Sequence, residues 1–463
     1  MLTTPVEAFV ARRRALSDRL SGPALLAAGL PPSRNYRANV YPFRAKSHFL
    51  YFVGRHFPGA ALLFHEGRTI LFTQAPDPDD ALWHGPRPTL AALAAELRFD
   101  EVRDVAAIDG ALAELGVERG AIATLPTEDP LSAAWLGERL GRTVPFSSGD
   151  TLTPPDDALA EAMIALRLRH DAAAIAQLRR AAEVSAEAHV AGMKATRPGG
   201  SEREILAAMV QVLRREGLED AYGPIVTTAG EVLHSDDHSQ PTMAGDLLLA
   251  DVGGEMPEGW AADITRTWPV SGRYSASQRA IYDVVLASQE AAVGAVAPGR
   301  RYRDVHEVAK RVIVEGLREL GIFKGEVDGL LERGAAAVFF PHGVGHLVGL
   351  DVHDMEDLGD RAGYAPGRSR SAAFGDAFLR LDRDLEPGML VTIEPGFYQV
   401  PGILGDAQYT GALGADLDRG RLADFADVRG IRIEDDVLVT PEGHDVLTAG
   451  VPKRAAEIEA LMA

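Results

Sequence analysis

The sequence contains no cysteine among its 463 residues. This absence excludes disulfides, thiolate metal ligands and cysteine nucleophiles, so any bound metal must be held by histidine, aspartate and glutamate. The chain also lacks an apolar run of about 18 residues, the length of a membrane span. Its N-terminus, MLTTPVEAFVARRRAL, lacks the apolar core of a signal peptide. We therefore expect no membrane association and a cytoplasmic location.

Positive charge is scarce relative to negative charge. The chain has 47 lysine and arginine residues against 67 aspartate and glutamate residues, a formal net charge of −20. Such a field repels nucleic acid and anionic membranes, so we expect neither as a partner. With 46% apolar and 25% charged residues the composition is otherwise that of a globular protein, and the length predicts two or three domains.

The first third of the chain mixes short apolar strands with alanine-rich helices. AALLF (60–64) and TILFT (69–73) predict neighbouring strands, and TLAALAAEL (89–97) predicts a helix. TLTPPDD (151–157) combines two prolines with two acids, which is typical of a linker. We therefore expect a domain boundary just after this stretch.

The rest of the chain alternates helix patterns with strand-like runs. A long helix is expected over residues 171–195, and capping boxes from Ser201 to Glu204 and from Ser275 to Gln278 predict two more helix starts. The strand-like runs are LLLADV (247–252), AADITRTW (261–268), MLVTIE (389–394) and GIRIEDDVLVT (430–440). Blocks of helices with hairpin-like strand pairs favour an antiparallel α+β domain.

Two aspartates stand on the strands of the first predicted hairpin. Asp251 ends an apolar strand, and Asp263 lies within the strand that follows a short PEG turn. A lone aspartate in such a place is commonly a turn or cap residue. Two of them beside buried aliphatic side chains repel each other unless a cation separates them, so the pair suggests a metal site.

Two glutamates repeat this arrangement later in the chain. Glu394 closes the run MLVTIE, and Glu434 lies in GIRIEDDVLV, where alternation puts Arg432 and Glu434 on one face of the strand. A glutamate flanked by buried isoleucines is costly unless it is paired or binds metal. A salt bridge to Arg432 and a metal ion are the two interpretations that the pattern leaves open.

Residues 341–354, PHGVGHLVGLDVHD, hold His342, His346 and His353 of the 13 histidines in the chain. Three glycines disfavour a helix here and the glutamate of an HExxH motif is missing, so the pattern disfavours a helical zinc pair at His342 and His346. The four carboxylates with one imidazole carry a charge of about −4, which two divalent cations would neutralise. Such an oxygen-rich set favours Mn²⁺, Co²⁺ or Fe²⁺ over structural zinc, and a paired-metal site indicates a hydrolase.

Several stretches together resemble the pita-bread dimetal peptidases, in the branch of aminopeptidase P and prolidase. They are LHSDDHSQ (233–240), LLLADVGG with AADITRTWPVSG (247–272), FFPHGVGHLVGLDVHD (339–354), LEPGMLVTIEPGFY (385–398) and GIRIEDDVLVT (430–440). Earlier, YPFRAKSHFLYFVG (41–54) and ALWHG (81–85) look like the non-catalytic domain that precedes the peptidase in aminopeptidase P. The resemblance implies an α+β chain, with a pita-bread catalytic domain over 161–463 behind a smaller α/β N-terminal domain over 1–160.

The resemblance also implies a metal site and a reaction. Two divalent metal ions, most often Mn²⁺ with Co²⁺, Fe²⁺ or Zn²⁺ as alternatives, would be held by Asp251, Asp263, His346, Glu394 and Glu434. In such enzymes a metal-bridging hydroxide attacks the carbonyl of the bond between an N-terminal residue and proline. The resemblance implies that Glu394 would take the proton of the nucleophile and help to deliver it to the prolyl nitrogen.

Other residues receive supporting roles from the same resemblance. His353 and His234 would bond the carbonyl oxygen as negative charge develops on it. His342 would line the proline side of the pocket. Tyr398 and Arg432 would orient the carboxylates that bind metal.

Two spacings depart from the usual pattern of the family. Asp251 and Asp263 are 12 positions apart, one more than usual, and we expect the MPEGW turn to absorb the extra residue so that both side chains point inward. Glu394 and Glu434 are 40 positions apart, close to the prolidase pattern. We expect the insert at 399–428 to be an exposed loop near the site.

Specificity features point to both branches. Arg380 stands where prolidases place the arginine that binds the carboxylate of a dipeptide, whereas residues 320–343 and 447–462 look more like bacterial aminopeptidase P. Trp83 in ALWHG matches a residue that approaches the active site of a neighbouring subunit in those enzymes. Simple domain packing is the alternative for this tryptophan.

The sequence therefore predicts a Xaa-Pro aminopeptidase, a metallo-exopeptidase that acts on small peptides with proline at the second position. A Xaa-Pro dipeptidase restricted to dipeptides is the alternative. A non-catalytic binding module on the same fold is disfavoured, because the ligand set is complete. The resemblance further implies a homodimer or a homotetramer.

Overall fold

The computed structural model describes residues 2–77, 79–145, 152 and 154–463, and over these residues the chain forms two compact units. The smaller unit contains Leu2–Ala174 and Met355–Ala362, and the larger contains Ile175–Asp354 and Gly363–Ala463. No helix in the described part of the chain is long and apolar enough to span a membrane.

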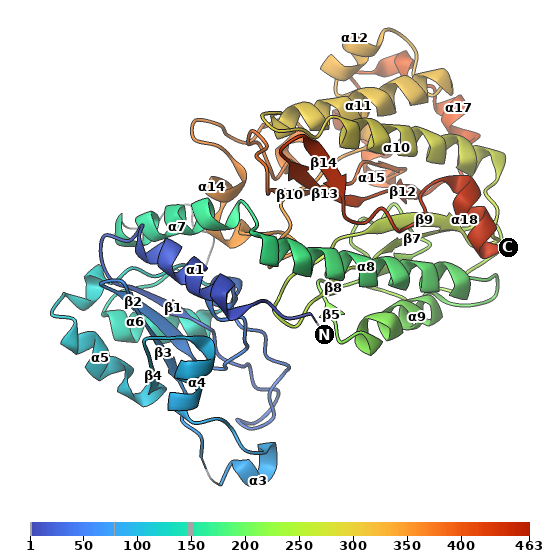
Figure 1. Ribbon diagram of the computed structural model, residues 1–463. Helices are drawn as coiled ribbons and strands as arrows, with labels where there is room; N and C mark the ends of the chain where they lie inside the picture. Colours follow the sequence, from blue (N-terminus) through green and yellow to red (C-terminus); the bar gives the residue numbers. More distant parts are fainter. Residues whose placement is uncertain (1, 78, 146–151, 153) are drawn as a thin grey trace. The chain divides into compact units, whose positions relative to one another are not determined.

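The smaller unit is built around a four-stranded sheet in the order β1-β2-β3-β4, drawn in blue in Figure 1. β2 pairs antiparallel with both β1 and β3, whereas β3 and β4 are parallel. The elements up to α7 are α1 (Val6–Ser17), β1 (Ala24–Ala27), α2 (Ser47–Val53), β2 (Ala61–His65), β3 (Arg68–Thr73), α3 (Ala81–His84), α4 (Leu90–Leu97), β4 (Glu101–Asp104), α5 (Ile108–Glu114), α6 (Pro130–Leu140) and α7 (Pro154–Arg167).

The strand pair predicted from AALLF and TILFT is confirmed as β2 and β3. These strands contribute to an apolar core that contains Leu25, Leu63, Phe72, Leu112 and Leu136. The helix predicted over 89–97 is confirmed as α4, which begins where the Thr89 hydroxyl accepts a hydrogen bond from the Ala92 amide. Short apolar runs and the alanine-rich pattern therefore predict these elements correctly.

The linker predicted at 151–157 is wrong where the structure describes it, and residues 151 and 153 lie outside the described residues. Pro154 opens helix α7, because proline fits the first helical turn, where its missing N–H needs no partner. Asp156 is buried and accepts hydrogen bonds from the Arg142 guanidinium (2.7 Å) and the Thr124 amide (2.8 Å). The domain boundary predicted at residue 160 therefore falls inside a helix.

From α8 onward the chain combines long helices with short strands. The elements are α8 (Ala172–Ala195), α9 (Glu202–Arg215), β5 (Glu219–Asp220), β6 (Ile225–Thr227), β7 (Leu247–Asp251), β8 (Gly254–Glu255), β9 (Thr265–Pro269), α10 (Ala276–Gly294), α11 (Tyr302–Glu319), α12 (Val327–Glu332), α13 (Ala335–Phe339), α14 (Asp360–Gly363), β10 (Leu390–Ile393), β11 (Gly396–Tyr398), α15 (Pro401–Gly405), α16 (Ala407–Thr410), α17 (Arg419–Ala423), β12 (Gly430–Arg432), β13 (Asp435–Thr440), β14 (Gly443–Val446) and α18 (Ala455–Met462). The helices expected over 171–195, after Ser201 and after Ser275 are confirmed as α8, α9 and α10.

The described strand pairs of the larger unit all run antiparallel, as the sequence predicts. The strand orders are β6-β7-β9, β10-β13-β14, β11-β12 and β5-β8. Helices α10 and α11 run side by side (Figure 1) and bury Ile281, Val285 and Ile313. The larger unit therefore has an antiparallel α+β architecture.

The strand pair that carries Glu394 and Glu434 is interrupted in its middle. β10 pairs with β13, while β11 pairs with β12. Glu394 lies between β10 and β11, and Glu434 lies between β12 and β13. The continuous strand predicted over 430–440 is therefore wrong at Glu434, because the chain leaves the ladder there and resumes pairing with a different strand.

The strand predicted over 261–268 is also shorter than expected. β7 and β9 pair as the predicted hairpin, with Asp251 opposite Thr265, but β9 begins only at Thr265. Asp263 lies in the segment before it, where its amide donates a hydrogen bond to the Asp436 carboxylate (3.0 Å). Asp263 is therefore held by a side chain of β13 rather than by a strand partner.

The insert at 399–428 is not the exposed loop that the sequence predicts. It contains the short helices α15, α16 and α17, and it buries Leu417, Leu422 and Phe425. The Arg333 guanidinium donates to the Asp416 carboxylate (2.7 Å) and so joins the insert to the end of α12. The segment is folded because its few apolar residues are buried. Its polar overall composition did not predict this burial.

Two glycines of the smaller unit allow a test of packing against backbone strain. Gly54 ends α2 at φ 66°, and a Cβ there would overlap the Phe9 ring, whereas Gly67 has φ 75° and open space around it. Gly54→Ala and Gly67→Ala should each lose about 1–2 kcal/mol of unfolding free energy from left-handed strain. Gly54→Ala should lose a further ~1–3 kcal/mol from overpacking.

Urea unfolding followed by circular dichroism measures this difference, with Gly67→Ala as the matched control. Equal losses of unfolding free energy in the two variants would contradict the overpacking prediction. They would show that the Phe9 ring moves aside without a measurable loss of stability.

Candidate active site

A cavity of about 560 Å³ opens in the larger unit. Most of the site residues that the sequence predicts line it together: His234, Asp251, Asp263, His342, His346, His353, Arg380, Glu394, Arg432 and Glu434. Asp251 and Asp263 both line it, and the MPEGW turn between them is closed by a hydrogen bond from the Met256 amide to the Trp260 carbonyl (2.9 Å).

The segment that carries His346 is held close to β10. The His346 amide donates to the Thr392 hydroxyl (3.1 Å), and the ring nitrogen Nδ1 lies 3.1 Å from the Leu347 carbonyl. A carbonyl oxygen only accepts, so Nδ1 carries the ring proton and Nε2 keeps its lone pair. Gly345 permits this approach, because a Cβ there would overlap the Thr392 carbonyl and the Tyr302 hydroxyl.

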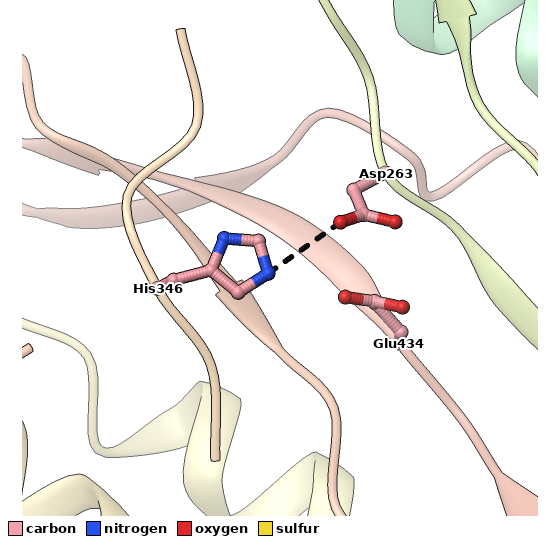
Figure 2. Close-up of side chains that lie close together, drawn as sticks. All are labelled: Asp263, His346 and Glu434. Carbon is pink, nitrogen blue, oxygen red and sulfur yellow. Dashed lines mark ion pairs between the residues drawn. The ribbon is translucent and has the colours of Figure 1, made fainter. Parts of the chain in front are cut away.

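The bare nitrogen of His346 faces carboxylates. Nε2 lies 3.5 Å from Asp263 Oδ2 and 3.5 Å from Glu394 Oε1. Ligand atoms of Asp263, His346 and Glu434 all lie within 4.8 Å of one another, and Figure 2 shows these side chains converging from three separate segments. One imidazole nitrogen among several carboxylate oxygens is a donor set suited to divalent cations.

The carboxylates of this cluster repel one another. Burial, together with the charges of Asp251 and Asp436, raises the pKa of Asp263 well above its usual value. Burial and the charges of Asp263 and Glu394 do the same to the pKa of Glu434. A divalent cation among these oxygens would remove the repulsion and allow them to ionise, so the residues present fit a bound metal.

Two neighbours orient the Asp251 carboxylate. Arg432 Nη2 donates to Oδ2 (2.6 Å), and the Tyr222 hydroxyl donates to Oδ1 (2.6 Å). Arg432 is therefore the salt-bridge partner of Asp251, while Glu434 accepts a hydrogen bond from the Thr265 hydroxyl (2.6 Å). These contacts fix the rotation of both carboxylates before any ligand binds.

A fully buried arginine supports the Glu434 segment from behind. Arg266 Nη1 donates to the Glu434 carbonyl (2.6 Å), and its Nη2 donates to Asp435 Oδ1 (2.7 Å). Lys453 donates to the other oxygen of Asp435 (2.7 Å). These bonds hold the backbone at Glu434 in place, at the point where strand pairing is interrupted. The position from which the Glu434 side chain extends is therefore fixed.

His342 belongs to a hydrogen-bonded chain that leads to Asp251. Its Nδ1 lies 2.8 Å from the Gly343 carbonyl and therefore donates, so Nε2 accepts from the Tyr398 hydroxyl at 3.0 Å. Arg432 Nη1 donates to the same hydroxyl (3.0 Å). Tyr398 thus links the imidazole of His342 to the guanidinium that orients Asp251.

Burial keeps the histidines of the cavity uncharged at neutral pH. Burial and the charge of Arg432 lower the pKa of His342 to about 3, and burial and the charge of Arg380 lower the pKa of His353 to about 4. The pKa of His234 is lowered by burial and by Arg432. A neutral imidazole both donates and accepts one hydrogen bond, so these rings can act on a polar substrate.

The two residues that the sequence predicts for substrate binding occupy different places. Arg380 lines the cavity, and its charge acts on His346 as well as on His353. Trp83 lies on α3 in the smaller unit, with 78% of its surface exposed. The structure brings Arg380 together with the other predicted residues but gives Trp83 no place in this cavity.

Sequence patterns missed several residues of the site, and four of them make informative contacts or line the cavity with a large side chain. Tyr222 bonds Asp251, Thr265 bonds Glu434, and Arg370 and Phe378 line the cavity. Thr265 stands two positions after Asp263, so strand alternation was an available signal for it. Tyr222, Arg370 and Phe378 lie in loops or in a short 3₁₀ turn. Hydrophobic periodicity gives no signal in such segments.

Comparison with known proteins agrees with this geometry. The family described as "Metallopeptidase family M24" matches residues 176–441, and "Aminopeptidase P, N-terminal domain" matches residues 9–123. The Xaa-Pro aminopeptidase of Escherichia coli K12 is 33% identical over 472 aligned positions, which cover 98% of this chain and 97% of that protein.

Solved structures are similar over the whole chain. An aminopeptidase from Pseudomonas aeruginosa matches with a TM-score of 0.82 and 34% identity, covering 100% of this chain and 99% of that one. Aminopeptidase P from E. coli with the inhibitor Pro-Leu matches with a TM-score of 0.80 and 32% identity, covering 99% and 98%. With its pita-bread fold and its candidate metal ligands at one cavity, this chain belongs to metallopeptidase family M24 and carries an aminopeptidase P N-terminal domain.

Proposed function

We propose that this protein is a Xaa-Pro aminopeptidase, which removes an N-terminal residue that precedes proline. The observation that supports it is the donor set at the cavity, where His346 directs a bare Nε2 at Asp263 and Glu394. The full-length similarity to aminopeptidase P enzymes adds the substrate class. The larger unit would be the catalytic domain, and the smaller unit would be the non-catalytic one.

The cavity would hold two divalent metal ions. Their ligands would be Asp251, Asp263, His346, Glu394 and Glu434. Because four of these five groups are carboxylates, the site favours Mn²⁺, and Co²⁺, Fe²⁺ or Zn²⁺ could occupy the same donors. When bound, the metals supply Lewis acidity and lower the pKa of a water molecule toward neutrality.

The protein's own residues would bind the peptide and move a proton. Glu394, whose Oε2 lies 3.8 Å from His342 Nδ1, would accept a proton from the attacking water and deliver it to the prolyl nitrogen. His353 and His234, both uncharged, would donate hydrogen bonds to the carbonyl oxygen as negative charge develops on it. His342 would line the wall that receives the proline ring.

A Xaa-Pro dipeptidase is the second candidate function, because Arg380 lines the cavity. Its positive charge lies near enough to His353 and His234 to lower the pKa of both. A guanidinium in this place would bind the free carboxylate of a dipeptide substrate.

We also propose a homodimer or a homotetramer. Trp83 and Leu82 are 78% and 80% exposed on α3, which leaves two large apolar side chains uncovered in the single chain. In an assembly this tryptophan would approach the active site of a neighbouring subunit. Sedimentation of the wild-type protein and of Trp83→Ala would measure its contribution.

The proposed function is tested by hydrolysis of Ala-Pro, Ala-Pro-Ala and Ala-Ala-Ala in the presence of Mn²⁺. We expect cleavage of Ala-Pro-Ala after its first residue and no cleavage of Ala-Ala-Ala, measured by the release of alanine. Cleavage of Ala-Pro alone would establish the dipeptidase instead. Metal binding with no hydrolysis of any peptide would establish a binding module.

The roles of neighbouring histidines are separable by substitution. The rings of His346 and His353 lie 4.3 Å apart, so the two alanine variants disturb the same region. Groups that only orient metal ligands change affinity by about 10–100-fold, so His346→Ala should weaken Mn²⁺ binding at least as much. His353→Ala should keep Mn²⁺ and lose about 10²–10³-fold in kcat.

Calorimetric titration with Mn²⁺ and peptide kinetics on both variants make this measurement. Loss of metal in His353→Ala, or its full retention in His346→Ala, would contradict the assignment.

Arg380→Ala tests the carboxylate contact. Losing a charged hydrogen bond should lower kcat/KM for Ala-Pro by about 10–100-fold, because such a bond contributes ~1.5–3 kcal/mol. The loss for Ala-Pro-Ala should be smaller, since its prolyl residue has no free carboxylate. Equal losses on the two substrates would count against this role.

A further inference from the structure

One short segment supplies both an aromatic and a cationic side chain to the cavity. The turn Asp376–Phe378 is a single 3₁₀ turn, and Arg380 follows two residues after it. Phe378 lines the cavity while 55% of its surface is exposed, and Arg380 lines the cavity as well. The position of this turn therefore determines where the Phe378 ring and the Arg380 guanidinium lie in the cavity.

Two side chains converge on the carbonyl that immediately precedes Arg380. Arg370 Nη1 donates to the Leu379 carbonyl (2.9 Å) and, more weakly, to the Ala377 carbonyl (3.4 Å). The Tyr364 hydroxyl donates to the same Leu379 oxygen (2.7 Å). A carbonyl oxygen has two lone pairs, so these donors occupy both and fix the peptide plane from which Arg380 departs.

The front of the same turn is anchored separately. Lys310 Nζ donates to the Asp376 carboxylate (2.8 Å), and His306 Nε2 lies 3.4 Å from it. The backbone of the turn also packs on Gly343, where a Cβ would lie 2.7 Å from Leu379 Cα. The turn is thus held from α11 and from the His342 segment, and Arg370 and Tyr364 hold its last carbonyl.

The bonds of Arg370 to this turn are made by a guanidinium that lies at the surface. The residue is exposed, and its guanidinium lies 5.5 Å from the Tyr364 ring centroid, in the same pair of residues that bonds Leu379. Arg368, two positions earlier, instead donates to the Asp384 carboxylate (2.8 Å) and does not line the cavity. Arg368 is therefore a nearby control that bonds another part of the segment outside the cavity, whereas Arg370 bonds Leu379 and itself lines the cavity.

We propose that Arg370 is a positioning residue for substrate selection: by bonding the carbonyls of Ala377 and Leu379 it holds Arg380 in the orientation that binds a free carboxylate on the prolyl residue. This inference rests on the second candidate function proposed above, in which Arg380 meets the free carboxylate of a dipeptide. Arg370 acts through the backbone of the turn and not through its own charge, and Tyr364 shares the task.

The test compares Ala-Pro with alanyl-prolinamide, which differ only in the free carboxylate. In the Mn²⁺-loaded full-length enzyme, Arg370→Met should raise KM for Ala-Pro about fivefold more than KM for the amide, with kcat for Ala-Pro nearly retained, as expected when one hydrogen bond to the carboxylate is misdirected. Tyr364→Phe removes a donor to the same carbonyl without changing charge. It should shift the KM ratio in the same direction.

Arg368→Met is the control and should leave the ratio of the two KM values at the wild-type level. Equal rises in KM for acid and amide in Arg370→Met would overturn the proposal, because a general disturbance of the cavity would produce them. A wild-type ratio in Tyr364→Phe together with a changed ratio in Arg370→Met would also overturn it, since the charge of Arg370 would then act directly.

A binding measurement separates this inference from the proposed function. Calorimetry measures the affinity of Arg370→Met for proline, which has a free carboxylate, and for prolinamide, which has none. We expect a loss of affinity for proline alone, and the measurement does not depend on turnover. Absence of peptide cleavage by the wild type would refute the proposed function. Equal affinity changes for proline and prolinamide would refute the role of Arg370.

Discussion

The accumulation of negative charge in one buried cavity constrains the rest of the larger unit. Asp251, Asp263, Glu394 and Glu434 line the same cavity, and burial together with mutual repulsion raises the pKa of Asp263 and Glu434. Such an arrangement is stable only where something compensates it, through protons or cations. Neighbouring side chains accordingly hold two of these carboxylates, since Arg432 and Tyr222 bond Asp251 and Thr265 bonds Glu434.

Positive side chains surround the cluster without filling it. Arg432 pairs with Asp251 at the edge of the cavity, and Arg266 pairs with Asp435 behind Glu434, where both groups are fully buried. Besides its carboxylate partner, Arg432 donates to the Thr265 and Tyr398 hydroxyls, and Arg266 donates to the Glu434 and Val451 carbonyls. Breaking a buried pair of this kind leaves a charge without compensation, so both arginines are as necessary to the fold as to the site.

The geometry of the backbone does the rest of the positioning. The interruption between β12 and β13 places Glu434 where a regular strand would have continued its pairing, and Glu394 occupies the matching interruption between β10 and β11. Gly345 lets the chain pass against Thr392, so His346 Nε2 meets the carboxylates from the other chain segment. At the same cavity, a turn held at several points carries Phe378 and leads to Arg380.

The sequence by itself determined the residue types of the site, the antiparallel α+β class and the helix starts, because motif spacing, alternation and capping are local properties of the chain. It misjudged the linker at 151–157, where Pro154 opens a helix, and the loop at 399–428, which buries apolar side chains and is joined to α12 by Arg333. It also misjudged the continuous strand at 430–440, because the chain changes its pairing partner at Glu434. Only the tertiary structure decided that Arg432 bonds Asp251 and that Arg370 holds the carbonyl before Arg380. These contacts join residues or turns whose proximity depends on packing, which no local pattern records.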